Sequence, residues 1–298
     1  MIGKRGAGLA VMWQNLLLSF LLLVCFSCDK NQSSVQNESY IAPPSRIISF
    51  TPSITEILYE LGLGESIVGV TDFCNYPQEA AQKNKIGGHL DRRYETVLRL
   101  KPDLAIILKE QHDLIPFFDK YAIRYITVGS DSIGEILESI QSIASAASVG
   151  DRGDSLVQNL RRRVEKVSSL TSARVGSRVL LTVGRTVGIG TITSCYAAGS
   201  MSFYNELIEI IGGENVLKDI PQSYPSVSAE AIIRLNPDII IDISSAHSKN
   251  PEETYCDDWS ALKTVAAVKE GKVHCLSGDY LTIPGPRFVM ILEKFEKI

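Results

Sequence analysis

One twelve-residue segment occurs twice in the chain, and this repeat constrains the fold more than any other feature. Residues 95–106 read ETVLRLKPDLAI, and residues 230–241 read EAIIRLNPDIII. In each copy an amphipathic pattern meets a residue that precedes proline, where the α conformation is disfavoured, so a helix is expected to end there. The unbroken apolar run that follows is typical of a strand buried on both faces of a parallel sheet. Each copy therefore predicts a helix, a tight turn and a strand. The acids of the first copy, Glu95 and Asp103, are not expected to be catalytic.

Other elements recur in the same order around the two copies. Each half begins with a strand pattern, continues with a helix pattern closed by glycine, and ends with a strand pattern followed by glycine. In the first half these segments are RIISF, TPSITEILYELGLGE and IRYITVGS, and in the second half they are RVLLTVG, YNELIEIIGGEN and KVHCLSGD. The order predicts an α/β protein with two Rossmann-like lobes, each built on a parallel central sheet, at residues 45–135 and 175–298.

The segment between the lobes, residues 136–174, has a helical pattern almost throughout. Apolar residues recur near helical spacing in DSLVQNLRRRVEKVSSL, whose consecutive arginines are expected on a solvated face. We therefore expect one long α-helix to bridge the two lobes. Such a joint permits mainly small rocking motions, whereas hinged strands would permit wide closure.

The first 28 residues form a separate targeting segment. Lys4 and Arg5 precede a long apolar stretch, and Ser27-Cys28 leads into the polar residues 29–44, which are expected to be a flexible linker. The pattern resembles a bacterial lipoprotein signal with Cys28 as the lipidated first residue, and an uncleaved membrane anchor is the alternative. We therefore expect an exported protein on the periplasmic or cell-surface side, anchored to the membrane by lipid.

The composition is that of a globular protein, with 45% hydrophobic and 21% charged residues. A net charge of −4 and the absence of any run rich in lysine and arginine exclude nucleic acid as an expected partner. The chain contains no G-x-S-x-G, no G-x-x-x-x-G-K-[ST] and no H-E-x-x-H motif. We therefore expect no enzyme and no cofactor. An exported hydrolase using serine and histidine on loops is the rival from another class.

Neither the four cysteines after residue 28 nor the four histidines show metal-binding spacing, since these cysteines form no C-x-x-C pattern and the histidines form no H-x-x-x-H pattern. For the four cysteines after residue 28 we favour buried thiols that pack as small apolar groups. A disulfide between Cys256 and Cys275 stays open, because an exported protein can form one. His274 falls within a strand pattern and is expected to be structural. His89 follows two glycines in a loop, where it could ligate the metal of a bound complex, donate a hydrogen bond or simply be exposed.

Ligands of open α/β sheets bind outside the carboxyl ends of the strands, so two facing lobes predict a cleft lined by the loops that follow strands. These loops are rich in Tyr, Ser, Thr, Gly and Pro, a composition suited to an organic ligand held by stacking and hydrogen bonds. They read TPSIT, TDFCNYP, GGHLDRR, LKEQH, GRTVGIGTITSCYAAGSMSFY, PQSYPSVS and GDYLTIPGPR. Within the fifth, GIGTIT lacks an acid placed to hold a ribose. We interpret it as a loop that needs close backbone approach, not as a dinucleotide site.

Several longer motifs, spread over residues 46–288, carry a family resemblance. They are RIISFTPSITEILYELGLGESIVGV, CNYPQEA, YETVLRLKPDLAI, YNELIEIIGGENVLKD, YPSVSAEAIIRLNPDIII and PGPR. With them the chain resembles the helical-backbone substrate-binding proteins of ABC importers, the class III periplasmic binding proteins. Members of that family carry vitamin B12 and other corrinoids, ferric siderophores or haem to a membrane permease. The vitamin B12 binders are the most similar.

The resemblance implies a monomer that captures a corrinoid between its lobes, with little closure, and delivers it to an ABC permease and its ATPase. A ferric siderophore or haem is the alternative ligand. Where the B12 binders carry tryptophans, this chain has His89, Leu108, Tyr224 and Tyr280, a thinner aromatic wall. Glu230 matches the permease-docking glutamate of the second lobe, and Glu110 is the best candidate in the first. The implied ligand-binding residues are Pro52, Ser53, Tyr76, His89, Tyr224, Asp279, Tyr280 and Arg287.

Overall fold

The computed structural model describes residues 42–171, 176–244 and 256–298. The predicted signal segment, Cys28 and nearly all of the predicted linker 29–44 lie outside the described residues. Within residues 42–171, 176–244 and 256–298, no helix combines the length and the apolar character needed to cross a bilayer.

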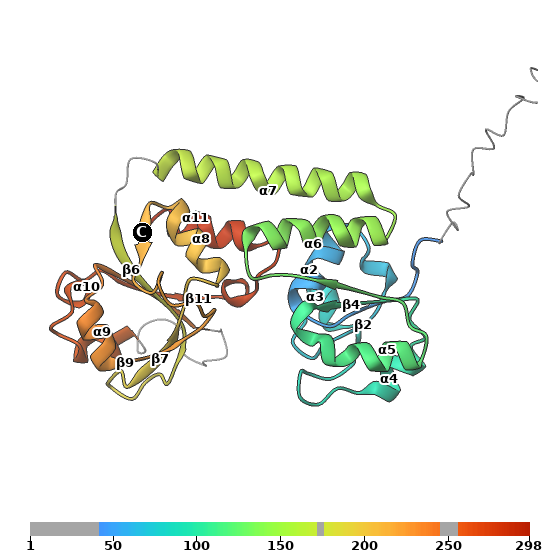
Figure 1. Cartoon of the computed structure of the whole chain (residues 1–298), viewed down its shortest axis with the longest axis horizontal. Coiled ribbons are helices and arrows are strands. Elements are labelled where there is room, and N and C mark those ends of the chain that lie inside the picture. The colour runs from blue at the N-terminus through green and yellow to red at the C-terminus, as the bar shows by residue number, and fades with distance from the viewer. Residues whose placement is uncertain (1–41, 172–175, 245–255) are drawn as a thin grey trace, which may run out of the picture. The chain divides into compact units, whose positions relative to one another are not determined.

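The first lobe, coloured blue to green in Figure 1, is built on a five-stranded parallel sheet in the order β3-β2-β1-β4-β5. Helices α2 and α6 pack on one face and α4 and α5 on the other, because alternate residues of the central strands β1 and β4 are buried in two separate apolar clusters. The strands are β1 Ile47–Ser49, β2 Ile67–Val70, β3 Asn84–Lys85, β4 Leu104–Leu108 and β5 Tyr125–Val128. The helices are α2 Pro52–Glu60, α3 Gln78–Ala81, α4 Tyr94–Arg99 and α5 Ile115–Lys120, with 3-10 helices η1 Gly64–Ser66 and η2 Lys109–Leu114.

The second lobe contains a six-stranded sheet in the order β11-β10-β6-β7-β9, with β8 also paired to β6. Strands β6, β8, β10 and β11 are parallel, as predicted, whereas β7 and β9 add an antiparallel edge. Strand β7 lies in the segment that we interpreted as a long loop. The strands are β6 Ser177–Arg185, β7 Ser194–Ala197, β8 Gly213–Asn215, β9 Ser226–Ser228, β10 Ile239–Ser244 and β11 Val273–Ser277. The helices are α8 Phe203–Ile210, α9 Ala229–Leu235, α10 Ala266–Lys269 and α11 Phe288–Phe295, with 3-10 helices η3 Cys256–Ala261 and η4 Asp279–Thr282.

The repeated segment forms the same unit twice, α4 followed by β4 and α9 followed by β10, as predicted. The turn residue before proline is left-handed in both copies, with φ of 45° at Lys101 and 44° at Asn236. In the first copy, Asp103 accepts the backbone N–H of Arg46 at 3.0 Å, and the Arg46 guanidinium donates to the carbonyl that ends α4, Leu100 O, at 2.7 Å.

The second copy repeats these contacts with equivalent residues. Asp238 accepts the N–H of Arg178 at 2.8 Å, and Arg178 donates to Leu235 O at 2.6 Å. The repeated aspartate thus fixes the start of the neighbouring strand, and the arginine at that strand start caps the orphan carbonyls of the helix. The repeated aspartate and its arginine partner therefore have a structural role.

Two helices, not one, fill the segment between the lobes. Helix α6, Ile133–Ala146, packs on α2 and β5 of the first lobe, and it ends before Ser148, which has a φ of 59°. Helix α7, Gly150–Thr171, is 22 residues long and contacts α6 on one side and α8 and α11 of the second lobe on the other. One apolar cluster runs through these contacts and includes Ile140, Val157, Val167 and Phe288. The predicted bridge is therefore α7, and it shares a core with both lobes.

Cys256 and Cys275 form a disulfide that ties η3 to the edge strand β11, with Cα atoms 5.9 Å apart. Our preferred interpretation of these two as buried thiols is therefore wrong, because the packing of η3 on β11 brings them together. Cys74 and Cys195 are free and buried, as we expected.

We expect the double substitution Cys256→Ser with Cys275→Ser to lower the free energy of unfolding by about 2–4 kcal/mol, since the bond closes a loop of 19 residues in the unfolded chain. Urea denaturation with and without reductant measures this. Reductant should destabilise the wild type by a similar amount and leave the double variant unchanged. Equal stability of the oxidised wild type and the double variant would contradict the expectation.

Candidate functional site

A cavity of about 450 Å³ lies between residues of the first and second lobes. Its first-lobe wall is made by residues that follow strands β1, β2, β4 and β5, which confirms the expectation that strand-end loops line a cleft. At the base of this wall are Phe50, Thr51, Thr71, Leu108, Gln111 and Ser130.

The base of the cavity is held by hydrogen bonds of the half-buried Thr51 and the buried Gln111. Thr51 is the N-cap of α2 and accepts the N–H of Ile54. Gln111 accepts the N–H of Leu108 at 3.0 Å and donates to the carbonyl of Phe50 at 3.3 Å, so it joins the ends of β4 and β1. The base is thus a rigid surface that presents backbone, hydroxyl and ring atoms to a ligand.

Phe73 and His89 form the open rim on the first-lobe side. Phe73 is 63% exposed although it lines the cavity, which makes it the large apolar group most available for ligand contact. His89 is exposed, and its Nδ1 lies 3.2 Å from Nη2 of Arg92, whose guanidinium also pairs with Asp113. Arg92 and Asp113 thus orient the imidazole at the rim.

Four charged side chains lie together where β4 and β5 end. The Lys109 ammonium is 2.5 Å from Glu135, 3.1 Å from Asp131 and 4.0 Å from Glu110. The hydrogen bond that Lys109 donates to Glu135 holds the pKa of Lys109 above its usual value. Burial alone would raise the pKa of Glu135, but the hydrogen bond and charge of Lys109 together with backbone hydrogen bonds from Asp131 and Ser130 outweigh it, and the pKa is lowered. Of the four, Glu110 and Asp131 line the cavity.

Tyr224, Thr282 and Pro284 form the second-lobe wall. Tyr224 is 42% exposed, and its ring meets the buried ring of Tyr204 edge to face at 6.4 Å. The Tyr204 hydroxyl in turn donates to the carbonyl of Leu281, next to Thr282. Tyr204 therefore links the two segments of this wall.

Arg287 does not line the cavity, and it joins the lobes through Glu56. Its guanidinium donates to both carboxylate oxygens of Glu56 on α2, at 2.5 and 3.0 Å, and to Asp279 at 3.0 Å. It also lies over the ring of Tyr76 at 3.8 Å and near that of Tyr280 at 5.7 Å. Burial raises the pKa of Glu56 although Arg287 opposes the shift. We name these five residues the Arg287 cluster.

The predicted ligand-binding residues therefore divide into two groups. His89 and Tyr224 line the cavity, while Tyr76, Asp279, Tyr280 and Arg287 form the Arg287 cluster with Glu56. Pro52 and Ser53 follow the cavity residue Thr51 in the first turn of α2. A direct ligand contact by each of the eight stays a prediction.

Phe73 and Asp131 also line the cavity but were not predicted individually. Each lies in or beside a loop that follows a strand, and this position in the sequence could have identified both as candidates for the cavity wall.

The two helix starts of the repeat carry equivalent acids. Glu230 is the second residue of α9 and Glu95 is the second residue of α4, and both are exposed. Backbone N–H groups and Ser228 lower the pKa of Glu230, as expected at a helix N-terminus. The repeat could have identified Glu95 as the first-lobe counterpart of Glu230. Glu110, our candidate for that role, lines the cavity, and its part in docking stays a prediction.

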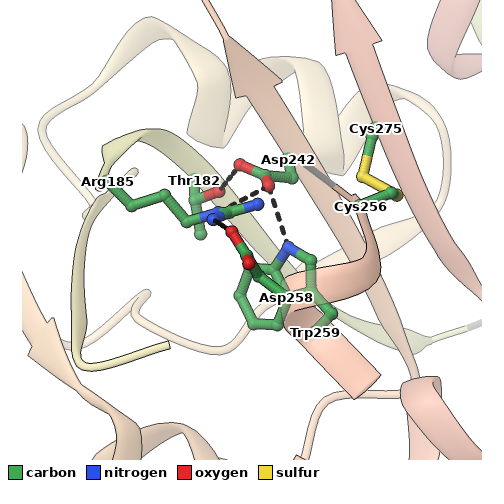
Figure 2. Close-up of a disulfide and its surroundings, with 7 residues drawn as sticks. All are labelled: Thr182, Arg185, Asp242, Cys256, Asp258, Trp259 and Cys275. Carbon is green, nitrogen blue, oxygen red and sulfur yellow. Dashed lines mark hydrogen bonds and ion pairs between the residues drawn. A yellow bond between two sulfur atoms is a disulfide. The ribbon is translucent and has the colours of Figure 1, made fainter. Parts of the chain in front are cut away.

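Arg185, Asp242 and Asp258 form a buried ion cluster in the second lobe (Figure 2). This cluster anchors the loop that contains Gly188 and Gly190. Arg185 donates to Asp242 at 2.8 Å and to Asp258 at 2.6 Å, and all three side chains are at most 2% exposed. Thr182 and Trp259 also donate to Asp242, at 2.6 and 2.8 Å. The buried carboxylates thus accept hydrogen bonds from several donors, because a buried charge is costly unless it is paired and hydrogen-bonded.

Asp258 accepts the N–H groups of Gly188 and Gly190 at 2.8 and 2.6 Å. Burial alone would raise the pKa of Asp258, but Arg185 and these two N–H groups lower it. Both glycines have a φ near +74°, and nothing lies within 4 Å of the position of their missing Cβ atoms. The glycines therefore serve a left-handed turn around a carboxylate, and our expectation of close backbone approach is wrong.

Among the residues with described positions, no group of three or more His, Cys, Asp or Glu could hold a metal ion. His274 lies within β11, as predicted, and burial lowers its pKa.

Residues 47–280 match the family model described as periplasmic binding protein. The uncharacterized ABC transporter substrate-binding lipoprotein YvrC of Bacillus subtilis is 28% identical, with 98% of this chain and 96% of that protein covered. The vitamin B12-binding protein of Vibrio parahaemolyticus is 24% identical over 86% of this chain and 91% of its own length.

Among solved structures, a possible iron-binding (periplasmic solute-binding) protein of Staphylococcus epidermidis is 27% identical. It covers 86% of this chain and 98% of its own, with a TM-score of 0.72. The family match spans most of the chain, and the chain therefore belongs to the periplasmic binding protein family, the solute-binding proteins of ABC transporters, and is not an enzyme.

Proposed function

We propose that the chain is a lipid-anchored solute-binding protein that captures a corrinoid or a similar metal chelate and delivers it to an ABC permease and its ATPase. The cavity between the lobes carries this proposal, because it combines a rigid base with exposed aromatic and hydroxyl groups at its rim. The vitamin B12 relative supports the corrinoid, and the iron-binding neighbour supports a ferric siderophore as the alternative, with haem as a further one.

The anchor rests on Cys28 and on the lipoprotein relative. Several acyl chains, at roughly 0.8 kcal/mol for each buried CH₂, would hold the protein at the membrane.

Purified protein lacking residues 1–28 should bind at least one chelate class when cobalamins, ferric siderophores and haem are titrated separately. Absorbance changes of the chelate and a rise in Tm report binding, since a ligand at 100 times its Kd adds about 2.7 kcal/mol of stability. No response to any of the three classes would refute the ligand proposal.

Docking on the permease is proposed to use Glu230 and Glu95, which occupy the equivalent exposed position of each lobe. Charge reversal is the sharpest change, because like charges across an interface cost several kcal/mol. We expect Glu95→Lys and Glu230→Lys each to reduce transport into proteoliposomes at least tenfold and to change ligand affinity less than twofold.

Glu138→Lys on the exposed side of α6 is the matched control and should transport normally. If either docking variant lost ligand affinity in parallel with transport, the residue would belong to the binding site. If both transported like the control, the docking assignment would be refuted.

A further inference from the structure

The charge of the cavity wall carries one more inference. Among the described residues that line the cavity, Glu110 and Asp131 are the acids, and no lysine or arginine contributes. Asp131 and Glu110 follow the ends of β5 and β4, so they face the cavity from a fixed edge of the sheet.

Lys109 does not neutralise these acids. Its single ammonium is shared among Glu135, Asp131 and Glu110, at 2.5, 3.1 and 4.0 Å. One positive and three negative charges leave this group of four side chains with a net charge of −2. The cavity therefore has a negative edge at the ends of β4 and β5.

The other basic side chains near the cavity are directed to partners of their own. Arg92 pairs with Asp113, and Arg287 pairs with Glu56 and Asp279. Lys85 donates to the backbone carbonyls of Thr71 and Cys74, at 3.3 and 2.9 Å. An anionic group on a ligand would have to displace one of these contacts to find a cation.

The uncharged part of the wall suits a ligand with amide groups and apolar edges. Thr51, Thr71, Ser130 and Thr282 offer hydroxyls that can both donate and accept, and Phe50 and Phe73 offer ring surface. Corrinoids with amidated side chains and ferric trihydroxamates have this chemistry. Haem carries two carboxylates, and a ferric tricatecholate carries three negative charges.

We propose that this cavity selects metal chelates without net negative charge and rejects polyanionic ones, with Glu110 and Asp131 as the residues that determine this specificity. The inference rests on the proposed chelate-binding function and narrows its substrate class. The Glu110 and Asp131 side chains are 51% and 46% exposed, so salt screens their repulsion of a ligand anion and the discrimination is largest at low ionic strength.

The test measures Kd for cyanocobalamin, a ferric trihydroxamate, haemin and a ferric tricatecholate, on protein lacking residues 1–28. We expect at least one of the first two to bind ten or more times tighter than either anionic chelate. The double variant Glu110→Gln with Asp131→Asn should tighten binding of an anionic chelate at least tenfold and change that of the uncharged chelate less than threefold.

The control is Asp119→Asn with Glu138→Gln, which removes the same charge from two exposed acids that do not line the cavity. It should leave all four Kd values unchanged, and thermal unfolding verifies that both double variants are folded. Wild-type protein that binds haemin or the tricatecholate as tightly as the uncharged chelates would overturn this inference and leave the proposed function standing. Equal shifts in both double variants would also overturn it. Binding of none of the four would refute both.

Discussion

Replacing Arg185 with leucine is expected to lower the free energy of unfolding by about 3–5 kcal/mol, because it leaves buried charges without their counter-ion. The carboxylates of Asp242 and Asp258 would then remain in an interior where both are about 2% exposed. The N–H donors of Gly188, Gly190 and Trp259 stabilise these carboxylates but carry no full charge. Urea denaturation at pH 7.5 measures the loss.

The loss at Arg185→Leu should shrink as pH falls from 7 towards 4. In the wild type the pKa of Asp258 is lowered, so its contribution is complete above the ordinary value of about 3.9 and is lost only as pH falls through the lowered value. Without Arg185 the effect of burial dominates and the pKa of the Asp258 carboxyl rises. In the variant this carboxyl is therefore protonated, and its unpaired charge removed, at a higher pH than in the wild type.

Arg163→Leu is the matched control for this experiment. Its guanidinium also pairs with a carboxylate, Glu293 at 2.8 Å, but the two side chains are 37% and 42% exposed. The control should therefore cost at most about 1 kcal/mol. If Arg185→Leu cost no more than Arg163→Leu, the ion cluster would not hold the second lobe together as described.

Glu56→Ala is expected to cost about 3 kcal/mol of stability and to loosen the joint between the lobes. Glu56 accepts two hydrogen bonds from Arg287. In the variant, Asp279 would be the remaining carboxylate partner of Arg287. Because Glu56 belongs to α2 and Arg287 directly precedes α11, the pair spans the two lobes. Denaturation measures the stability, and distances between spin labels on α5 and α10 should broaden in the variant.

The pH dependence of Glu56→Gln separates this pair from a surface ion pair. Burial raises the pKa of Glu56, so the folded protein holds this proton more tightly than the unfolded chain. Its ionisation therefore removes stability as pH rises from the ordinary glutamate value through the raised one. Glu56→Gln should abolish that decline.

Glu293→Gln is the control, because the ionisation of Glu293 changes stability with pH in the opposite direction. The hydrogen bond from Arg163 lowers the pKa of Glu293, so its contribution is present above the ordinary value and is lost as pH falls. Equal pH profiles for the two variants, or an unchanged spin-label distribution in Glu56→Ala, would contradict the role of the pair as an interlobe joint.

The sequence predicted the features whose causes are local. The helix end at Lys101 and Asn236 follows from the next residue being proline, and the buried strands β4 and β10 follow from their unbroken apolar runs. The division of the segment between the lobes into two helices, α6 and α7, was not predicted. The break between them at Ser148 depends on how α7 turns back against α6.

The site was predictable as a set of loops but not residue by residue. Phe73 and Tyr76 occur in one loop, yet Phe73 lines the cavity and Tyr76 lies under Arg287. No periodicity distinguishes two aromatic residues three positions apart in a loop. The disulfide and the Glu56–Arg287 pair depend on contacts 19 and 231 residues apart, which the pattern of either segment alone cannot fix.

Trp259 packs in a separate apolar cluster of the second lobe, and it has a practical use. The chain has two tryptophans, and cleavage before Cys28 would remove the other, Trp13. The remaining indole is 1% exposed, lies three residues after the disulfide and donates to Asp242 beside Arg185. Since α7 joins both lobes through one apolar cluster, unfolding of either lobe should reach this indole in the same transition. The fluorescence of this single tryptophan can therefore report the stability of both lobes, including the gain from a bound ligand.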